Sequence, residues 1–365
     1  MRRKASEAKG AKGEKVKRFK GKKAASFSPS SPLPTDPLPV SSSLPSSTRI
    51  ISPSVVIVGA GRLGTALARA LASCGYRVDA LVTRRARHAA RAATLVGTET
   101  RALTVTQLEY LPSTDFLFLT TPDDELAQTA SRLATLKPLA RPTARTPSSM
   151  SVTTSARAPS TLRRVALHTS GALSSEALAP LRTCGFAVGS MHPLVAVSEP
   201  EAGAESLRRA FYCIEGDRAA VRAARRLVGH LGGQSFSIDT KHKALYHAAA
   251  VMASGHTVAL FHLATELLAR CGVGASKARR VLLPLLSSTF ENLSAHAPAR
   301  ALTGTFARAD AATVRKHLAA LEANDDDATA IYALLGKHAL RLAAETDADP
   351  AALREIARML ERFIH

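Results

Sequence analysis

The sequence contains no tryptophan, and only 4% of its residues are aromatic. Any core must therefore be built mainly from Ala, Leu and Val, which are common here. The four cysteines are scattered and form no CxxC pair, so we expect buried, reduced thiols and no metal site. No uninterrupted apolar run approaches the ~20 residues that span a bilayer, and no apolar secretory segment is visible, so we expect a soluble, cytoplasmic protein without a membrane partner.

Acidic residues are also scarce, and the formal net charge is +20. Residues 1–23 carry eleven Lys and Arg against two acids, and residues 137–164 carry six against none, so these two segments hold 15 of the 20 charges. Both segments are polar or Ser/Pro-rich, which predicts flexibility. Nucleic-acid binding is thus not expected of the body of the protein. A polyanion-binding arm at residues 1–53, or a mis-assigned start, is the alternative that the tail leaves open.

The remaining chain divides into two predicted domains. Between residues 54 and 239, short β-branched runs such as Val55–Val58 and Phe116–Leu119 alternate with helical stretches, around a flexible insertion at about 137–161. That alternation predicts an α/β Rossmann domain with a doubly wound parallel sheet. After Asp239 only helical patterns follow, so residues 240–365 are predicted to form an all-α C-terminal domain for substrate binding or dimerisation.

A dinucleotide fingerprint opens the first predicted domain. Gly59, Gly61 and Gly64 form GxGxxG directly after a buried strand and at the start of a helix, which is the context that gives this motif meaning. The first glycine permits a tight turn, the second lets a pyrophosphate approach the backbone, and the third allows close packing of helix and strand. Arg62 and Leu63 lie between them, where the helix N-terminus offers free N–H groups.

The end of the second predicted strand indicates the preferred nucleotide. An NAD site usually places an acid there, about 20 residues beyond the glycines, to bind the ribose 2′-hydroxyl. This sequence has Thr83, Arg84 and Arg85 instead, and Asp79 lies earlier, within the strand. Guanidinium groups bind phosphate bidentately, so the pattern predicts NADP(H), with NAD less favoured.

Further candidate site residues follow other predicted strands or lie at the start of the C-terminal domain. Thr120, Thr121 and Pro122 follow one strand, and Ser170 and Gly171 follow another; both groups are expected to line the nicotinamide path because ligands sit at the carboxyl ends of parallel strands. Candidates for substrate binding and proton transfer are His192, which precedes a proline, and three residues of the first C-terminal helix. Those three are Lys243, Tyr246 and His247. A solvated helix face and a turn histidine are the structural alternatives, and His168 can be a structural histidine or a ligand contact.

Together these segments resemble a family of oxidoreductases, without an assigned substrate, that join a Rossmann-like domain to a C-terminal domain of unknown function, number 2520. The matching stretches are VVIVGAGRLGTALA, FLTTPDDEL, LHTSGALSSEAL, GSMHPL, KALYHAAAVMAS and ALTGTFARADAATVRKHL. The resemblance implies a helical domain like those of pyrroline-carboxylate reductases and 6-phosphogluconate-type dehydrogenases, which form homodimers. GSMHPL is similar to a His-Pro segment of prephenate dehydrogenases, and Lys243 with His247 is loosely similar to the Lys-then-Asn helix of β-hydroxyacid dehydrogenases.

The chain departs from this family's pattern at three places. Gly255-His256 stands where an Asn is common, Thr305 where a Pro is usual, and Ala309 where a Gly is expected. The sequence therefore predicts an NADP-dependent oxidoreductase that transfers a hydride to or from a small carbonyl, imine or hydroxy substrate. The alternative is a non-catalytic NADP-binding or sensing protein whose basic tail binds a polyanion.

Overall fold

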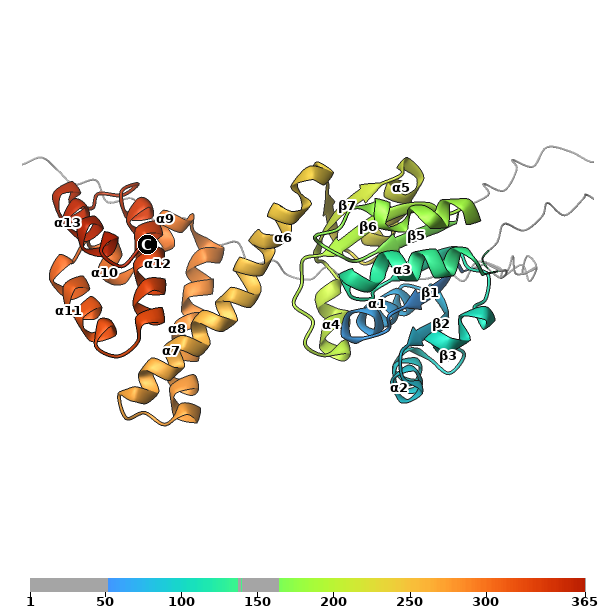
Figure 1. Cartoon of the computed structure of the whole chain (residues 1–365), viewed down its shortest axis with the longest axis horizontal. Coiled ribbons are helices and arrows are strands. Elements are labelled where there is room, and N and C mark those ends of the chain that lie inside the picture. The colour runs from blue at the N-terminus through green and yellow to red at the C-terminus, as the bar shows by residue number, and fades with distance from the viewer. Residues whose placement is uncertain (1–51, 137–138, 140–163, 365) are drawn as a thin grey trace, which may run out of the picture. The chain divides into compact units, whose positions relative to one another are not determined.

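The computed structural model describes residues 52–136, 139 and 164–364. Almost all of the predicted flexible tail and of the predicted insertion at about 137–161 lies outside these residues, and so does the proposed polyanion-binding arm. Figure 1 shows the order of helices and strands in the described part of the chain.

One sheet organises the first part of the described chain. Its strand order is β3-β2-β1-β4-β5-β6-β7-β8, and neighbours run parallel except for the antiparallel pair β6 and β7. The strand order reverses between the parallel neighbours β1 and β4. Sheets of this kind bind ligands at such a switch point. The strands are β1 Ser54–Val58, β2 Arg77–Thr83, β3 Arg101–Thr104, β4 Phe116–Leu119, β5 Val165–His168, β6 Ala187–Pro193, β7 Phe211–Gly216 and β8 Gln234–Phe236.

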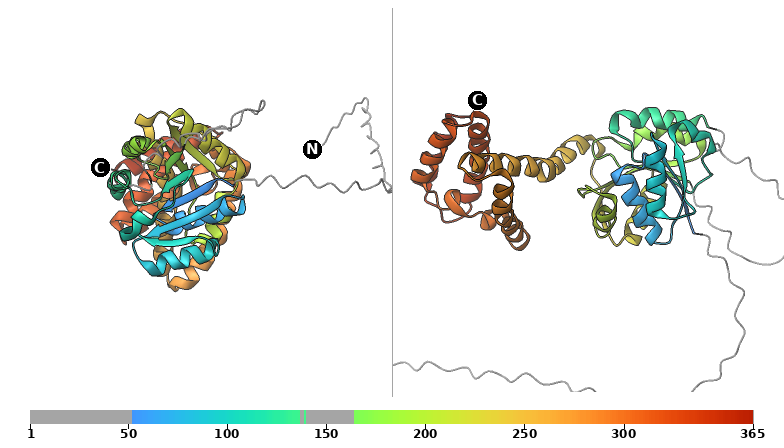
Figure 2. Two further views of the ribbon diagram at one scale, coloured as in Figure 1. Left: turned by 90° about the vertical axis from the view of Figure 1, so that its right-hand side faces the viewer. Right: turned by 90° about the horizontal axis from the view of Figure 1, so that it is seen from below.

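Helices cover both faces of this sheet, as Figures 1 and 2 show. Val55 and Ile57 of β1 belong to a core with residues of α1, α4 and α5, whereas Val56 and Val58 belong to a core with residues of α3 and η3. Alternate strand residues point to opposite faces, so a fully apolar strand feeds two cores. These elements are α1 Arg62–Ser73, α2 Ala86–Val96, the 3-10 helix η1 Val105–Tyr110, α3 Asp123–Ala134, the 3-10 helix η3 Ser175–Cys184, α4 Pro200–Leu207 and α5 Arg218–His230.

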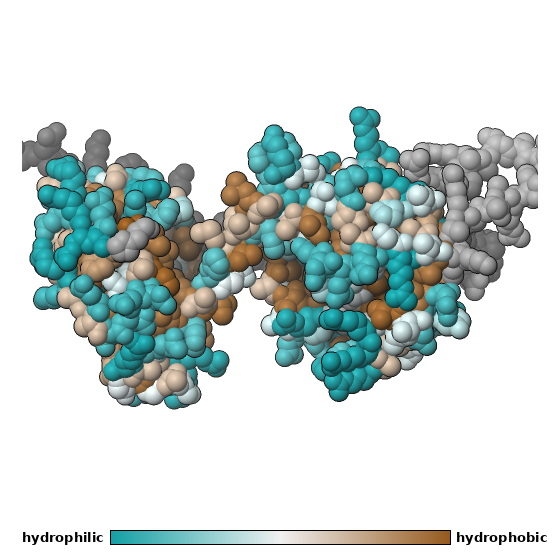
Figure 3. All heavy atoms as spheres, viewed as in Figure 1, coloured by the Kyte–Doolittle hydropathy of each residue, from teal (hydrophilic) through white to brown (hydrophobic). Residues whose placement is uncertain are grey.

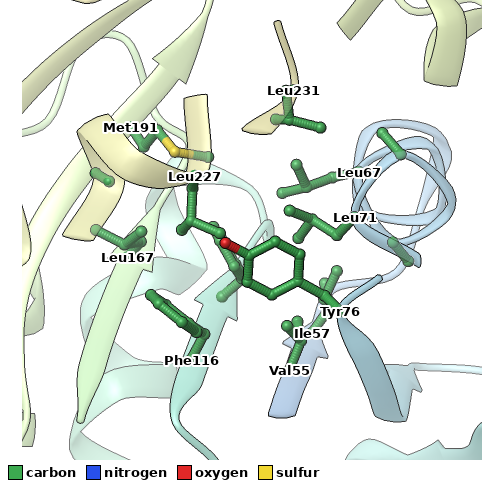
Figure 4. Packing of buried hydrophobic residues seen from close by; sticks show 14 of the residues in the cluster. Val55, Ile57, Leu67, Leu71, Tyr76, Phe116, Leu167, Met191, Leu227 and Leu231 are labelled. Carbon is green, nitrogen blue, oxygen red and sulfur yellow. The ribbon is translucent and has the colours of Figure 1, made fainter. Parts of the chain in front are cut away.

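Aliphatic side chains dominate these cores, as the low aromatic content requires. Figure 4 shows Tyr76 among leucine, isoleucine and valine side chains from α1, β1 and α5. Its ring meets the Phe116 ring edge-on, with centroids 6.0 Å apart. The Tyr76 hydroxyl lies 2.6 Å from Nδ1 of His230, so the polar end of this buried ring has a partner.

In the described residues after β8, every regular element is a helix. Asp310 caps α11 through a hydrogen bond from the Thr313 N–H, as its position before Ala311 predicts. Val314, Leu318, Ile356 and Leu360 contribute to a third, all-helical core, so the predicted fold class is confirmed. The elements are η4 Thr240–His242, α6 Lys243–Val251, a π-helical turn at Met252–His256, α7 Thr257–Arg270, α8 Ala275–Ala295, α9 Pro298–Ala301, α10 Gly304–Ala307, α11 Ala311–Glu322, α12 Asp326–Ala343 and α13 Pro350–Glu361.

Apolar side chains are exposed along α6, α7 and α8, where Figure 3 shows brown spheres at the surface. Leu245, Val258 and Leu285 are exposed by 72%, 69% and 64%. By length and composition alone, the stretch Thr240–Arg270 could cross a membrane, which by itself is a weak indication. Neighbouring exposed apolar side chains of this kind mark candidate interaction surfaces.

Candidate functional site

The glycine-rich turn after β1 brings three chain segments into close contact. Gly59 has φ +97°, and a Cβ there would lie 2.6 Å from the Thr120 carbonyl carbon and the Thr121 nitrogen. A Cβ at Gly64 would lie 2.4 Å from Thr120 Oγ1. These two positions therefore exclude any side chain, because β1, α1 and the end of β4 pack there without a gap.

Gly61 serves a different purpose. A Cβ at this position would meet only the Gly59 carbonyl oxygen, at 3.8 Å, so its exposed side is open. It is also the N-cap of α1, and no side chain caps that helix. The free N–H groups of the first turn therefore face open space, which is the arrangement that binds a phosphate.

A cleft of about 940 Å³, here called the cofactor cleft, runs from the end of β2 across this turn to α6. Gly64 is the one predicted cofactor-binding residue that does not line it, because Gly64 packs beneath the turn. The predicted residues that line the cleft are Gly59, Gly61, Arg62, Leu63, Thr83, Arg84, Arg85, Thr120, Thr121, Pro122, Ser170 and Gly171, together with His192 and His247.

The cleft also includes residues that sequence reasoning missed. His88 and Arg132 add further basic groups to its wall, and Glu125 lies 3.2 Å from the Arg84 guanidinium in an exposed ion pair. His88 is in the first turn of α2, and no motif marks it in the sequence. Asp79 lies away from this end and pairs with Arg77 at 2.6 Å, so no acid stands at the tip of β2.

One polar atom in the cleft wall has no partner. Thr121 Oγ1 is buried, and within the described residues it makes no hydrogen bond. A buried hydroxyl without a partner costs free energy unless a ligand or water satisfies it. The neighbouring Ser170 hydroxyl is fully used: it donates to Asp123 at 2.8 Å and accepts from the N–H groups of Ala172 and Leu173. Asp123 therefore binds Ser170 and is the first residue of α3, whose N-cap is Pro122.

At the far end of the cleft, two imidazole rings and a phenol meet. His192 of β6 lies with Nδ1 2.6 Å from the Tyr246 hydroxyl, and its ring meets the His247 ring edge-on at 5.6 Å. A Cβ on Gly171 would lie 2.6 Å from His247 Cδ2 and 2.9 Å from His192 Nε2, so a side chain at this position would have to displace one of the two rings. Three of the four predicted proton-transfer candidates thus come together.

Burial sets the protonation of this group. It lowers the pKa of His192 to about 4, with smaller effects from His247 and from the Lys243 charge, so His192 is neutral at pH 7. Burial also raises the pKa of the Tyr246 hydroxyl, which keeps its proton and makes a further hydrogen bond with Cys213. With Tyr246 donating to Nδ1, the neutral imidazole carries its proton on Nε2, beside Gly171.

Lys243 does not join them. Its side chain is 1% exposed, and its ammonium group donates to Ser190 Oγ at 2.7 Å and to Glu215 Oε1 at 3.3 Å. Glu215 in turn accepts from the N–H and the hydroxyl of Ser175, each at 2.8 Å. A buried ion pair therefore fixes the first residue of α6 beneath the sheet, and Lys243 does not line the cofactor cleft.

His168 is likewise internal. Its Nε2 lies 3.0 Å from the Ser174 carbonyl oxygen, and the Ser170 N–H donates to its Nδ1 at 3.2 Å. Burial, helped by the Lys243 charge, lowers the pKa of His168 to about 3, so the ring is neutral and structural. It stabilises the turn that carries Ser170 and Gly171 into the cleft.

Comparison with known proteins agrees with this architecture. Residues 40–193 match the model of a Rossmann-like domain, and residues 210–339 match the domain of unknown function DUF2520. No curated protein matches the sequence.

Two solved structures are similar in fold. One is a candidate NADP oxidoreductase from Bacteroides fragilis, with 21% identity, a TM-score of 0.60 and coverage of 79% of this chain and 98% of that one. The other is a protein of Thermotoga maritima, with 21% identity, a TM-score of 0.57 and coverage of 84% and 99%.

Proposed function

We propose that this chain, which matches the models of a Rossmann-like domain and of a DUF2520 domain, is an NADP-dependent oxidoreductase acting on a small carbonyl, imine or hydroxy compound. One observation carries the proposal. A single cleft joins an uncapped helix N-terminus, a cationic strand end and a neutral histidine with a tyrosine partner. Those are the groups that pyrophosphate binding, 2′-phosphate binding and proton transfer require.

The residues present fit the dinucleotide. Gly61 and the first turn of α1 would hold the pyrophosphate, and Thr121 Oγ1 is a free polar group for the nicotinamide half. Arg84 and Arg85, with His88 beside them, would bind a 2′-phosphate. The 2′-phosphate would compete with Glu125 for the Arg84 guanidinium. No acid stands at the tip of β2 to bind the ribose 2′-hydroxyl, as an NAD site would require.

Bound NADPH would supply a hydride at the end of the cleft near Gly171. During reduction the substrate oxygen or nitrogen gains negative charge and needs a proton. His192 would donate a hydrogen bond from Nε2 to that atom, because the ring is neutral and the Tyr246 hydroxyl holds Nδ1. As Nε2 gives up its proton, Nδ1 would take the Tyr246 proton, and solvent would reprotonate the phenolate. His247 would bind the substrate from the facing helix. Lys243 would contribute indirectly: its ion pair with Glu215 fixes α6 against the sheet and so positions Tyr246 and His247.

We also propose a homodimer through the exposed apolar face of α6, α7 and α8. A second copy accounts for this face better than a membrane does, because Lys243 and Tyr246 bind the Rossmann domain at the start of the same helix. Sedimentation equilibrium measures the mass directly. A monomer at micromolar concentration would contradict this part of the proposal. A cytoplasmic location, and domain limits at 54–239 and 240–365, stay predictions.

Calorimetric titration with NADPH and NADH tests the cofactor assignment. We expect NADPH to bind at least about tenfold more tightly, which corresponds to one charge-assisted contact of about 1.4 kcal/mol. Gly61→Trp should abolish binding of both, because its side chain would enter the cleft from a position without backbone strain. Gly229→Ala is the matched control, since a Cβ there meets nothing and Gly229 lies in α5 outside the cleft.

Turnover separates an enzyme from a binding protein. Tyr246→Phe should lower kcat at least about tenfold while leaving NADPH affinity unchanged, because the phenol contacts His192 and does not line the cleft. Binding of NADPH without turnover of any carbonyl or imine would favour the NADP-sensing alternative. No binding by a folded protein would refute the proposal.

A further inference from the structure

A second cavity lies beyond the two histidines. It has a volume of about 420 Å³, and His192 and His247 line it as well as the cofactor cleft. One wall continues β6 through Pro193 to Ala196, and the other is the α6 helix with the π-helical turn after it. Its size is that of a small-molecule site. We call it the substrate cavity, because the side chains at its junction with the cleft are the proposed proton-transfer group.

The walls of the substrate cavity are mainly apolar. No Lys, Arg, Asp or Glu is among its lining residues in the described part of the chain. Leu194, Val195, Ala250 and Val251 supply apolar contacts, and apart from the histidines the polar side chain is that of Ser254. Such walls would stabilise an apolar ligand by roughly 25 cal/mol per Å² of buried apolar surface and would leave an anionic group without a partner.

The cationic side chains elsewhere in the site are either already paired or do not line the substrate cavity. Lys243 is buried against Glu215 and Ser190, so its charge is already paired. Arg84 and Arg85 line the cleft at the end of β2 and do not line the substrate cavity. His192 stays neutral because burial lowers its pKa to about 4. A carboxylate or phosphate in this cavity would therefore find no cationic partner among the described lining residues.

The π-helical turn adds a directional contact. Met252–His256 interrupts the helix between α6 and α7, and Ser254 and Gly255 of this turn line the substrate cavity. Ser254 is exposed and supplies a hydroxyl group on this wall of the cavity. Turns of this kind occur frequently at functional sites because they redirect a side chain from the regular helix face.

We propose that the substrate cavity takes an apolar ketone, aldehyde or imine that carries no carboxylate or phosphate group. This rests on the proposed function and narrows it. The C=O or C=N carbon would gain a hydride from bound NADPH, and the electron pair of the double bond would move to oxygen or nitrogen. That atom would take the proton of His192 Nε2, Nδ1 would take the proton of Tyr246, and solvent would reprotonate the phenolate. NADPH is oxidised to NADP⁺, and the product is an alcohol or amine.

A matched pair of ligands tests the claim. Acetophenone and phenylglyoxylate differ in a methyl group against a carboxylate beside the same carbonyl. Binding of each to the full chain is measured by calorimetry, with and without saturating NADP⁺, and turnover is followed by NADPH consumption. We expect acetophenone to bind at least about tenfold more tightly than phenylglyoxylate. Tighter binding of phenylglyoxylate, or no binding of either, would overturn the proposal.

A variant pair on one helix tests the location. Ala250→Arg places a guanidinium in the cavity wall and should shift the preference toward phenylglyoxylate by at least about tenfold. Ala248→Arg adds the same charge at an exposed position of α6 that does not line the cavity, and it should leave the preference unchanged. An equal shift in both variants would contradict the location. Selective acetophenone binding without turnover would support the cavity and count against the proposed reaction, whereas a failure of the cofactor assignment appears separately in the NADPH titration.

Discussion

The buried pair of Lys243 and Glu215 gives a demanding prediction. The ammonium nitrogen lies 3.3 Å from the carboxylate oxygen, and both side chains are over 90% buried. At an effective dielectric constant of ~20 their attraction is about 5 kcal/mol, most of which offsets the cost of removing both charges from water. Removing one partner leaves the other charge buried and unpaired. Lys243→Met should therefore lower the free energy of unfolding by about 3–5 kcal/mol.

Urea denaturation of four proteins measures this: the natural chain, Lys243→Met, Glu215→Gln and the double variant. The double variant should be more stable than Lys243→Met by at least about 2 kcal/mol, because the glutamine introduced at position 215 is neutral and its amide oxygen can still accept from Ser175. A loss below about 1 kcal/mol for Lys243→Met, or additive losses in the double variant, would refute the reasoning. Abolished turnover with unchanged stability and NADPH affinity would instead make Lys243 the proton donor.

Three further results are expected. Arg84→Ala should weaken NADPH binding by about tenfold or more and leave NADH binding unchanged in calorimetry, because it removes a charge-assisted contact to the 2′-phosphate; equal losses would contradict the assignment. Ala309→Gly should raise the free energy of unfolding by about 0.5–1 kcal/mol in urea, because Ala309 is held at φ +50°, and no gain would show that the strain is relieved elsewhere. The free energy of unfolding should fall as the pH drops from about 6.5 toward 3, by about 1.4 kcal/mol per pH unit from His168 alone. In this range the unfolded chain binds a proton at His168, whereas the folded chain, in which the His168 pKa is about 3, does not. The variant His168→Asn should flatten that slope.

Local sequence patterns predicted the parts of the site that depend on neighbouring residues. An apolar β-branched run followed by GxGxxG determines β1, the turn and α1 together, because strand, tight turn and helix N-terminus are consecutive. The same holds for Asp310, which caps the helix directly after it. The family's glycine at position 309 also has a local meaning, since Ala309 here occupies a left-handed conformation.

Residues whose environment comes from distant segments were predicted less well. Spacing placed Lys243 and His247 on one helix face, yet it could not show that Lys243 meets Glu215 of β7, 28 residues earlier in the chain. Glu125 and His88 enter the cleft wall from α3 and α2, each three residues beyond a predicted cleft residue (Pro122 and Arg85), but no motif marks either one. Helix α2 and strand β3 were not predicted: β3 has four residues, two of them exposed, and α2 has neither a side-chain cap nor an acid in its first turn to mark its start.

The π-helical turn at Met252–His256 has a consequence for how this chain can vary. A turn of five residues inside a helix amounts to one inserted residue, and each residue rotates a helix by about 100°. The face that α6 presents to His192 and the face that α7 presents to its own neighbours are therefore out of phase by that angle. Substitutions within the turn can change the cavity wall and leave this phase intact. A deletion of one residue would turn every side chain of α7 onto a different face, so the turn sets the rotation of α7 and the helices after it relative to the part of α6 that contacts His192.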